Sequence, residues 1–156
     1  MRRANREVTE QSEILDIMAR CQVLRIAINT DTVPYILPVN FGMEPDGTAL
    51  YIHGAMTGTK YDLLVKDPRV SFEMDCTHGL AFDTEKGSCT MSYESVIGWG
   101  TITELTQADE KRNGLQRLLA HYQRDDFLMD AAMLARTRVL RLEICQMRAK
   151  RRGKLL

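Results

Sequence analysis

The sequence predicts an α+β protein that is mainly β, built on an antiparallel barrel with flanking helices. Two observations support this fold class. Runs in which apolar and polar residues alternate are joined by short turns, as in antiparallel hairpins. Helices are expected at the start and late in the chain, whereas a parallel sheet of the Rossmann type needs one between successive strands. The 156 residues, 44% of them hydrophobic, suffice for one compact domain.

The N-terminal part begins with a helix and a hairpin. A helix is expected over residues 9–20, because Thr9 can cap its first turn and apolar residues then recur at helical spacing. Residues 22–29 alternate in polarity, and residues 35–41 form a second β-rich run. The short turn between these runs predicts a hairpin.

A second hairpin follows directly. Residues 43–47 offer proline, aspartate and glycine in the order that a type I turn favours, and they lead into a strand over residues 49–53. Residues 69–76 alternate again. Residues 91–105 form a long strand whose glycines permit a bend.

The last part combines helices with a final strand. Thr106 and Asp109 resemble a capping box, and the apolar stripe that follows predicts a helix to about residue 122. A shorter helix is expected over residues 127–136. Period-2 alternation over residues 138–147 predicts the sixth strand.

Charge and cysteine content narrow the function classes. Twenty-one basic residues balance twenty-one acidic ones, so no global field favours nucleic acid or an anionic membrane. No apolar run approaches the roughly 20 residues that span a bilayer, and a cytoplasmic protein is expected. The four cysteines form no CxxC pair, which predicts reduced thiols, several of them buried.

One domain is expected over residues 1–156, with a basic tail over residues 148–156 that frays.

The stretch HGAMTGTK, residues 53–60, joins the third predicted strand to a helix. Small residues let the backbone approach a ligand closely, and the N–H groups of such a turn can converge on an anion. The helix N-terminus, the Lys60 ammonium and the hydroxyls of Thr57 and Thr59 would complete a phosphate site. The glycine spacing is not that of a Walker loop. The residues alone leave a phosphate site and an ordinary solvated turn both open.

This stretch, with PYILPVNF before it and YESVIGWGTITEL after it, resembles the flavin-binding split barrels related to pyridoxamine phosphate oxidase. Within that group it is most similar to the branch named after nitroimidazole resistance. The resemblance covers residues 2–147. It implies a split barrel of six to seven strands and a homodimer that holds FMN between its subunits, with NADH or NADPH as a transient electron donor.

The resemblance implies a role for the turn. Lys60 and Thr57 match positions at the FMN phosphate, beside the backbone of Gly54 and Ala55. His53 matches a histidine close to flavin or substrate, and it is the candidate catalytic residue. A hydrogen-bonded histidine at the barrel rim is the alternative.

Two other segments are implied to contact the flavin. Pro38, Val39 and Asn40 match the segment along the isoalloxazine ring. Ser95 and Trp99 match positions near the dimer interface, where they would touch the partner's flavin. For Trp99, an ordinary packing residue is the alternative.

The chain departs from the family pattern in two places. Met147, Arg148, Ala149 and Lys150 stand where related chains often carry threonine, glycine and lysine after the last strand. No pair of arginines with a histidine matches the pyridoxamine phosphate grip of the founding oxidases, so that activity is not expected.

Metal binding is not expected either. Cys76 and His78, with Cys89 or His121, could supply ligand atoms, but their spacing does not match paired zinc ligands.

The resemblance favours an FMN-dependent oxidoreductase that reduces nitroaromatic or similar electron-poor small molecules with NAD(P)H. A flavin- or haem-binding protein without turnover is the alternative, because no acid, base or nucleophile constellation is evident. A nucleic-acid-binding barrel would rest only on the fold class and the basic tail, and it is not expected.

Overall fold

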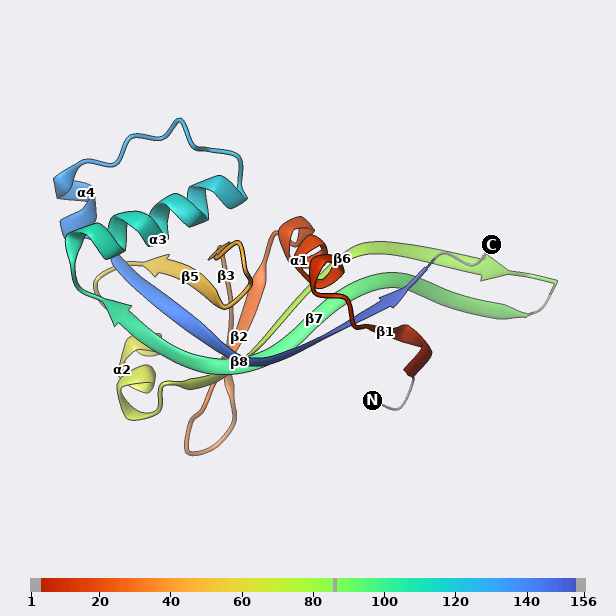
Figure 1. The fold of residues 1–156 in the computed structure, drawn as a ribbon. Coiled ribbons are helices and arrows are strands. Elements are labelled where there is room, and N and C mark those ends of the chain that lie inside the picture. The colour runs from red at the N-terminus through yellow and green to blue at the C-terminus, as the bar shows by residue number, and fades with distance from the viewer. Residues whose placement is uncertain (1–3, 86, 154–156) are drawn as a thin grey trace.

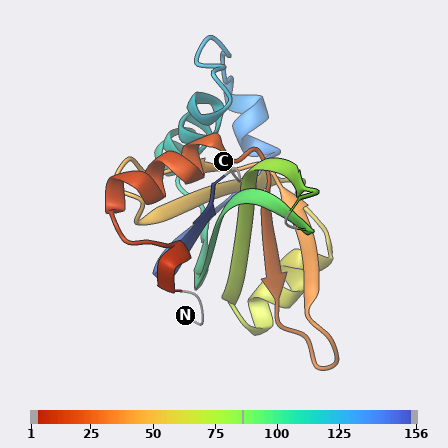
Figure 2. The ribbon, with the colours of Figure 1, turned by 90° about the vertical axis from the view of Figure 1, so that its right-hand side faces the viewer.

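The computed structural model describes residues 4–85 and 87–153, and these form one antiparallel sheet with helices around it (Figure 1). The strand order is β3-β2-β6-β7-β8-β5-β4, and β1 pairs with β8 outside this path. Figure 2 shows how the sheet curls on itself. The elements are η1 (Ala4–Arg6), β1 (Glu7–Val8), α1 (Gln11–Arg20), β2 (Leu24–Ile28), β3 (Tyr35–Val39), β4 (Gly42–Met43), β5 (Ala49–Gly54), α2 (Thr59–Lys66), β6 (Arg69–Asp83), β7 (Ser88–Leu105), α3 (Ala108–His121), α4 (Ala131–Ala135) and β8 (Arg138–Arg152).

The predicted fold class is confirmed: the sheet curls into a half-barrel of the α+β split-barrel type. All six predicted strands are present among the described residues. The structure adds β1 and β4, which have two residues each and are therefore too short to show an alternating pattern. No helix in the described part of the chain is long and apolar enough to cross a membrane.

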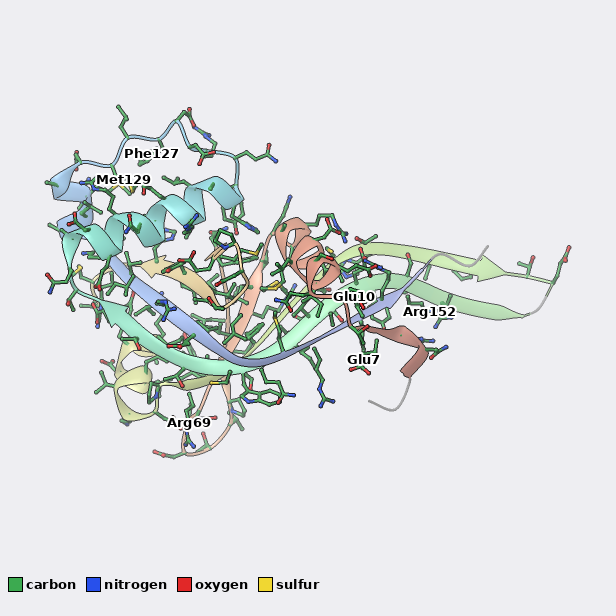
Figure 3. The ribbon with its side chains drawn as sticks, viewed as in Figure 1. Glu7, Glu10, Arg69, Phe127, Met129 and Arg152 are labelled. Carbon is green, nitrogen blue, oxygen red and sulfur yellow. The ribbon has the colours of Figure 1, made fainter. Side chains whose placement is uncertain are left out.

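Three strands, β6, β7 and β8, are longer than predicted by three residues or more. β6 and β7 continue past the barrel as a two-stranded arm, after a register shift in β6 between Cys76 and Gly79 (Figure 1). The predicted bend in β7 is confirmed by a register shift between Trp99 and Gly100. The tail does not fray from residue 148: β8 continues to Arg152, because its backbone pairs with β7. Figure 3 shows Arg152 at this end of β8.

The predicted threonine caps are wrong. α1 begins at Gln11 with Glu10 at the N-cap, and α3 begins at Ala108 with Gln107 at the N-cap. Neither N-cap side chain makes a capping hydrogen bond, and glutamate and glutamine are not among the preferred capping residues.

The predicted helix over residues 127–136 is shorter in the structure. α4 covers only Ala131–Ala135. Asp130 ends the preceding extended segment, and its carboxylate accepts a hydrogen bond from the Met133 N–H at 2.7 Å. Aspartate at this position starts a helix, so the helix does not extend back to Phe127.

Two apolar clusters stabilise the fold. The larger fills the inside of the curled sheet, where Ile17 and Met18 of α1 are fully buried with the inward side chains of the strands. The smaller lies under α3 and α4, around Leu115, Leu134 and Val139. Gly114 permits the close approach of α3 to the sheet, since a Cβ there would lie 2.8 Å from a Tyr51 ring carbon.

Candidate functional site

The predicted turn lies at one end of the sheet, where β5 ends and α2 begins. Gly54 closes β5 and pairs with Arg138, the first residue of β8. Residues 55–58 then lead into α2, whose first residue is Thr59. The N-terminus of α2 and the start of β8 are therefore neighbours, although they are far apart in the chain.

Arg138 is a site residue that the sequence analysis missed. Its Nε donates to Glu104 Oε1 at 2.8 Å, and its Nη2 makes a second hydrogen bond to the same carboxylate. Its Nη1 donates to the Met56 carbonyl in the turn at 3.3 Å. The guanidinium thus connects β8, β7 and the turn. No local pattern around residue 138 marks it, because its role depends on the β5–β8 register.

Lys60 and Arg138 bring two positive charges to Tyr61. The Lys60 Nζ lies 4.9 Å from the Tyr61 ring centroid, and the Arg138 Cζ lies 3.9 Å from it. Burial lowers the pKa of Lys60, and the Arg138 guanidinium lowers it further. An anion bound here would relieve this repulsion and favour the charged ammonium.

The Tyr61 hydroxyl is buried, and it has no hydrogen-bond partner among the described residues. Such groups in native proteins are uncommon, and a ligand can supply the missing partner. The Tyr61 side chain can donate one hydrogen bond, and burial raises the pKa of its hydroxyl, so the proton is retained.

Gly54 lets these groups pack directly against the backbone of β5. A Cβ at this position would lie 2.5 Å from the Tyr61 hydroxyl oxygen and 2.6 Å from the Lys60 Nζ, too close for either group to keep its place. The absence of a side chain at Gly54 therefore brings the hydroxyl and the ammonium together at the end of β5. We call Gly54, Lys60, Tyr61 and Arg138 the phosphate cradle. Its donors fit the phosphate end of a flavin nucleotide.

The other residues predicted in the turn are exposed around the cradle. Ala55 and Thr57 are exposed in the connection. Gly58 has φ +149°, a conformation that favours glycine. Side chains alternate along β5. The His53 side chain therefore lies on the face of the strand opposite to the one where a Gly54 side chain would meet Lys60 and Tyr61. Partial burial lowers the pKa of His53, and the Lys60 ammonium lowers it further.

The remaining predicted flavin residues lie on other segments of the sheet than the cradle residues. Pro38 and Val39 belong to β3, at one edge of the sheet, and Asn40 begins the connection to β4 at the other edge. Ser95 and Trp99 lie on β7, with Trp99 six residues before Leu105. At about 3.3 Å per residue, Trp99 is roughly 20 Å along the strand from the end of β7. Trp99 is 48% exposed, so it is not an ordinary core residue.

No group of three or more metal-ligating side chains converges within residues 4–85 and 87–153. His78 Nε2 lies 2.6 Å from Asp75 Oδ2, while His121 Nε2 contacts the Cys21 carbonyl oxygen at 2.8 Å. Cys21 is the one fully buried thiol in the described part of the chain, fewer than predicted.

Comparison with known proteins identifies the family. A sequence model described as pyridoxamine 5'-phosphate oxidase matches residues 10–151. The chain belongs to the pyridoxamine 5'-phosphate oxidase family. A search of curated proteins finds no match.

Solved structures in and around this family have the same fold. One is a protein from Bacteroides thetaiotaomicron named for 5-nitroimidazole antibiotic resistance. It is 25% identical, with a TM-score of 0.83 over 92% of this chain and 85% of that one. The flavocytochrome Anf3 from Azotobacter vinelandii is 19% identical, with a TM-score of 0.83 over 100% and 74% of the two chains. The FAD and heme binding protein from Mycobacterium smegmatis is 20% identical, with a TM-score of 0.82 over 96% and 75%.

Proposed function

We propose that this protein binds FMN through the phosphate cradle and acts as an FMN-dependent oxidoreductase. It would use NADH or NADPH to reduce nitroaromatic or similar electron-poor small molecules. The observation that carries the proposal is the gathering of two cations, Lys60 and Arg138, around Tyr61, whose buried hydroxyl has no partner among the described residues and lies against Gly54. Family membership and the named nitroimidazole-resistance relative support the reaction class.

The cradle residues have separate roles in this proposal. Lys60 supplies a mobile positive charge to the phosphate, and Tyr61 donates the hydrogen bond that its hydroxyl lacks. Arg138, held by Glu104, adds a fixed positive charge and keeps the turn in place through Met56. Thr57 and the backbone of Gly54 and Ala55 complete the phosphate contacts.

The other predicted site residues would lie beside the isoalloxazine ring of the flavin. Pro38, Val39 and Asn40 would run along the isoalloxazine, and His53 is the candidate to contact substrate. When bound, the flavin supplies hydride acceptance from a nicotinamide and electron transfer to a second substrate. The chain would position that group and exclude water from it.

The proposed active form is a homodimer. A flavin on one small barrel would leave a ring face open to solvent, and a second subunit would cover it. Exposed Trp99 and half-buried Ser95 on β7 support a role for this strand in the second subunit's contacts.

The first experiment is an FMN titration of the purified protein, followed by absorbance and by quenching of flavin fluorescence. Lys60→Ala is expected to weaken binding at least tenfold. Lys66→Ala, at the exposed far end of the same helix, is the matched control and should bind as the parent does. A parallel FAD titration tests the choice of nucleotide, because the similar protein from Mycobacterium smegmatis is named for FAD and heme. Equal binding by parent and Lys60→Ala would overturn the cradle assignment.

The second experiment measures NADH and NADPH oxidation by the flavin-loaded protein with a panel of nitroaromatics and quinones. Rates above the enzyme-free rate are expected for at least one acceptor. Oxidation that stays at the enzyme-free rate across the panel, with FMN saturating, would overturn the oxidoreductase proposal.

A flavin- or haem-binding protein without turnover is the second candidate. It is favoured by the fold shared with a flavocytochrome and with an FAD and heme binding protein. An anaerobic spectrum separates the two candidates. FMN that stays oxidised in excess NADPH, or a haem spectrum on addition of hemin, would favour the second.

A further inference from the structure

Two of the four cysteines meet where α1 packs on the sheet. α1 lies against β6 and β7 (Figure 1), and Cys21 directly follows its last residue. The Cys21 N–H donates to the Ile17 carbonyl oxygen at 3.2 Å, and the Cys76 Sγ on β6 contacts the same oxygen at 3.9 Å. The two cysteines, which are far apart in the chain, are therefore neighbours around one carbonyl group.

The two thiols have different surroundings. Cys21 is fully buried in the larger apolar cluster, whereas Cys76 packs against that cluster and is half-buried. Burial raises the pKa of the Cys21 thiol, and its interaction with the Cys76 thiol raises it further. Cys21 therefore keeps its proton, and Cys76 is the thiol of the pair that a solute can reach.

Polar groups surround the Cys76 sulfur. Arg20 Nη1 donates to Cys76 Sγ at 3.5 Å, and the Thr77 hydroxyl oxygen lies 3.4 Å from the same sulfur. The Arg20 guanidinium is held in place by the carboxylates of Asp16 and Glu94. The thiolate is the nucleophilic form of cysteine, and a neighbouring cation stabilises it. A thiolate at Cys76 would therefore have both a guanidinium and a hydroxyl as donors.

The irregular backbone after Cys76 brings in the hydroxyl. Thr77 has φ +58°, a conformation that is uncommon for residues other than glycine, and the β6–β7 register shifts between Cys76 and Gly79. In a regular strand, Thr77 would point away from Cys76, because side chains alternate. Here the Thr77 hydroxyl instead contacts Cys76 and donates to Glu94 at 2.7 Å. Bulges commonly redirect a side chain in this way next to reactive groups.

We propose that Cys76 and Cys21 form a thiol oxidation site, in which a hydroperoxide oxidises Cys76 and Cys21 then closes a disulfide with it. The Cys76 thiolate attacks one peroxide oxygen and the O–O bond breaks. The other oxygen leaves as water or an alcohol, and Cys76 becomes a sulfenic acid. The Cys21 sulfur attacks the Cys76 sulfur, and the hydroxide that leaves takes the Cys21 proton to form water. The pair thus gives two electrons to the peroxide, and thiol exchange with an external dithiol restores it.

The disulfide would connect the end of α1 to β6. These elements carry none of the cradle residues, so the proposal goes beyond the proposed function and does not rest on flavin binding. Cys89 and Cys145 are exposed on β7 and β8, and they are the internal comparison. Exposure alone would favour their oxidation over that of half-buried Cys76, whereas the proposed site favours Cys76.

The test is peptide mapping by mass spectrometry of the full chain without flavin. The reduced protein is treated with hydrogen peroxide, its remaining thiols are alkylated, and it is digested without reductant. A linked peptide containing Cys21 and Cys76 is expected, in a chain that runs as a single copy on a non-reducing gel and is restored by dithiothreitol. The Cys89→Ser/Cys145→Ser variant should form the same link, because neither exposed thiol takes part.

Two single variants separate the steps, and circular dichroism confirms that each is folded. Cys21→Ala should accumulate a sulfenic acid at Cys76 that dimedone labels, whereas in Cys76→Ala the Cys21 thiol should stay reduced. The oxidised parent should unfold at a higher urea concentration than the reduced parent, because the disulfide restricts the unfolded chain.

Three results would overturn the proposal. One is the absence of the linked peptide when Cys89 and Cys145 are oxidised. Another is oxidation of Cys21 in Cys76→Ala as fast as in the parent. The third is a disulfide that lowers the urea midpoint, since the two thiols would then meet only in a distorted fold.

Discussion

The Arg138 guanidinium lies over the ring of Tyr61, with its Cζ 3.9 Å from the ring centroid. A cation in this position is attracted by the ring electrons. Two hydrogen bonds to Glu104 hold the Arg138 guanidinium in this position without a ligand. Within the described part of the chain, the hydroxyl of the same tyrosine has no hydrogen-bond partner. Arg138 and Tyr61 together therefore offer a fixed cation and a hydroxyl that is free to donate a hydrogen bond. The contribution of each cradle residue to FMN binding can be tested by substitution.

Tyr61→Phe is expected to affect stability and binding in opposite directions. Removing a buried hydroxyl that has no partner should raise the free energy of unfolding by about 1 kcal/mol or leave it unchanged. The same change removes a phosphate donor, so FMN should bind roughly tenfold more weakly. Urea unfolding and FMN titration measure the two effects. A loss of more than about 1 kcal/mol of stability would show that the hydroxyl has a partner in the folded protein.

Gly54→Ala tests the close packing of the cradle. The added methyl would meet the movable ends of Tyr61 and Lys60, so the protein should fold with little loss of stability. The methyl would displace the hydroxyl and the ammonium proposed to hold the phosphate, and FMN affinity should fall at least tenfold. Gly153→Ala is the control, because a Cβ there has no atom within 4 Å. Parent-like FMN affinity in Gly54→Ala would contradict the cradle.

The pKa of His53 should rise when Lys60 is removed. The Lys60 ammonium disfavours the protonated imidazole, so Lys60→Ala removes a like-charge repulsion and leaves only the larger effect of burial. The pKa of His53 is measured by NMR titration of the imidazole carbon-bound protons. Lys66→Ala should leave the value unchanged. An unchanged value in Lys60→Ala as well would mean that the two side chains do not interact in solution.

Stability should fall in acid because of Glu94. This side chain is buried on the inner face of β7. Hydrogen bonds from Arg20, with smaller contributions from Thr77 and Arg151, outweigh burial and lower its pKa to about 2. A carboxyl whose pKa is lowered by folding stabilises the protein above its unfolded pKa. That stabilisation is lost as the pH falls through the folded value.

The expected loss is roughly 3 kcal/mol between about pH 5 and pH 2, from a pKa difference of about 2.5 units at about 1.4 kcal/mol each. Urea unfolding at several pH values measures it. Glu94→Gln is the control: it should be less stable than the parent at pH 6 and should lose less stability in acid. Parallel pH profiles for the two proteins would rule out Glu94 as the source.

Several elements could be predicted from local sequence, and their limits have physical causes. The alternation in β2 and in the middle of β8 is visible because each has one face in the core. β5 is buried on both faces from Ala49 to Ile52, so its prediction depended on the turn before it. The arm was missed because residues beyond Cys76 have no core to face, so their pattern carries no periodic signal. The predicted caps at Thr9 and Thr106 were wrong because the preceding extended segments continue through Glu10 and Gln107, and the helices begin one residue later. A local capping pattern does not show where such a segment ends.

The sequence by itself determined the positions of six strands, the turn that joins β5 to α2, and the resemblance that names the family. These depend on residue spacing over short distances, which backbone geometry converts directly into local structure. The tertiary structure alone decided that Arg138 joins Lys60 and Tyr61, and that Cys76 lies beside Cys21 at the end of α1. The first depends on strand register and the second on the packing of α1 against the sheet, since residues far apart in the chain become neighbours only when these elements meet.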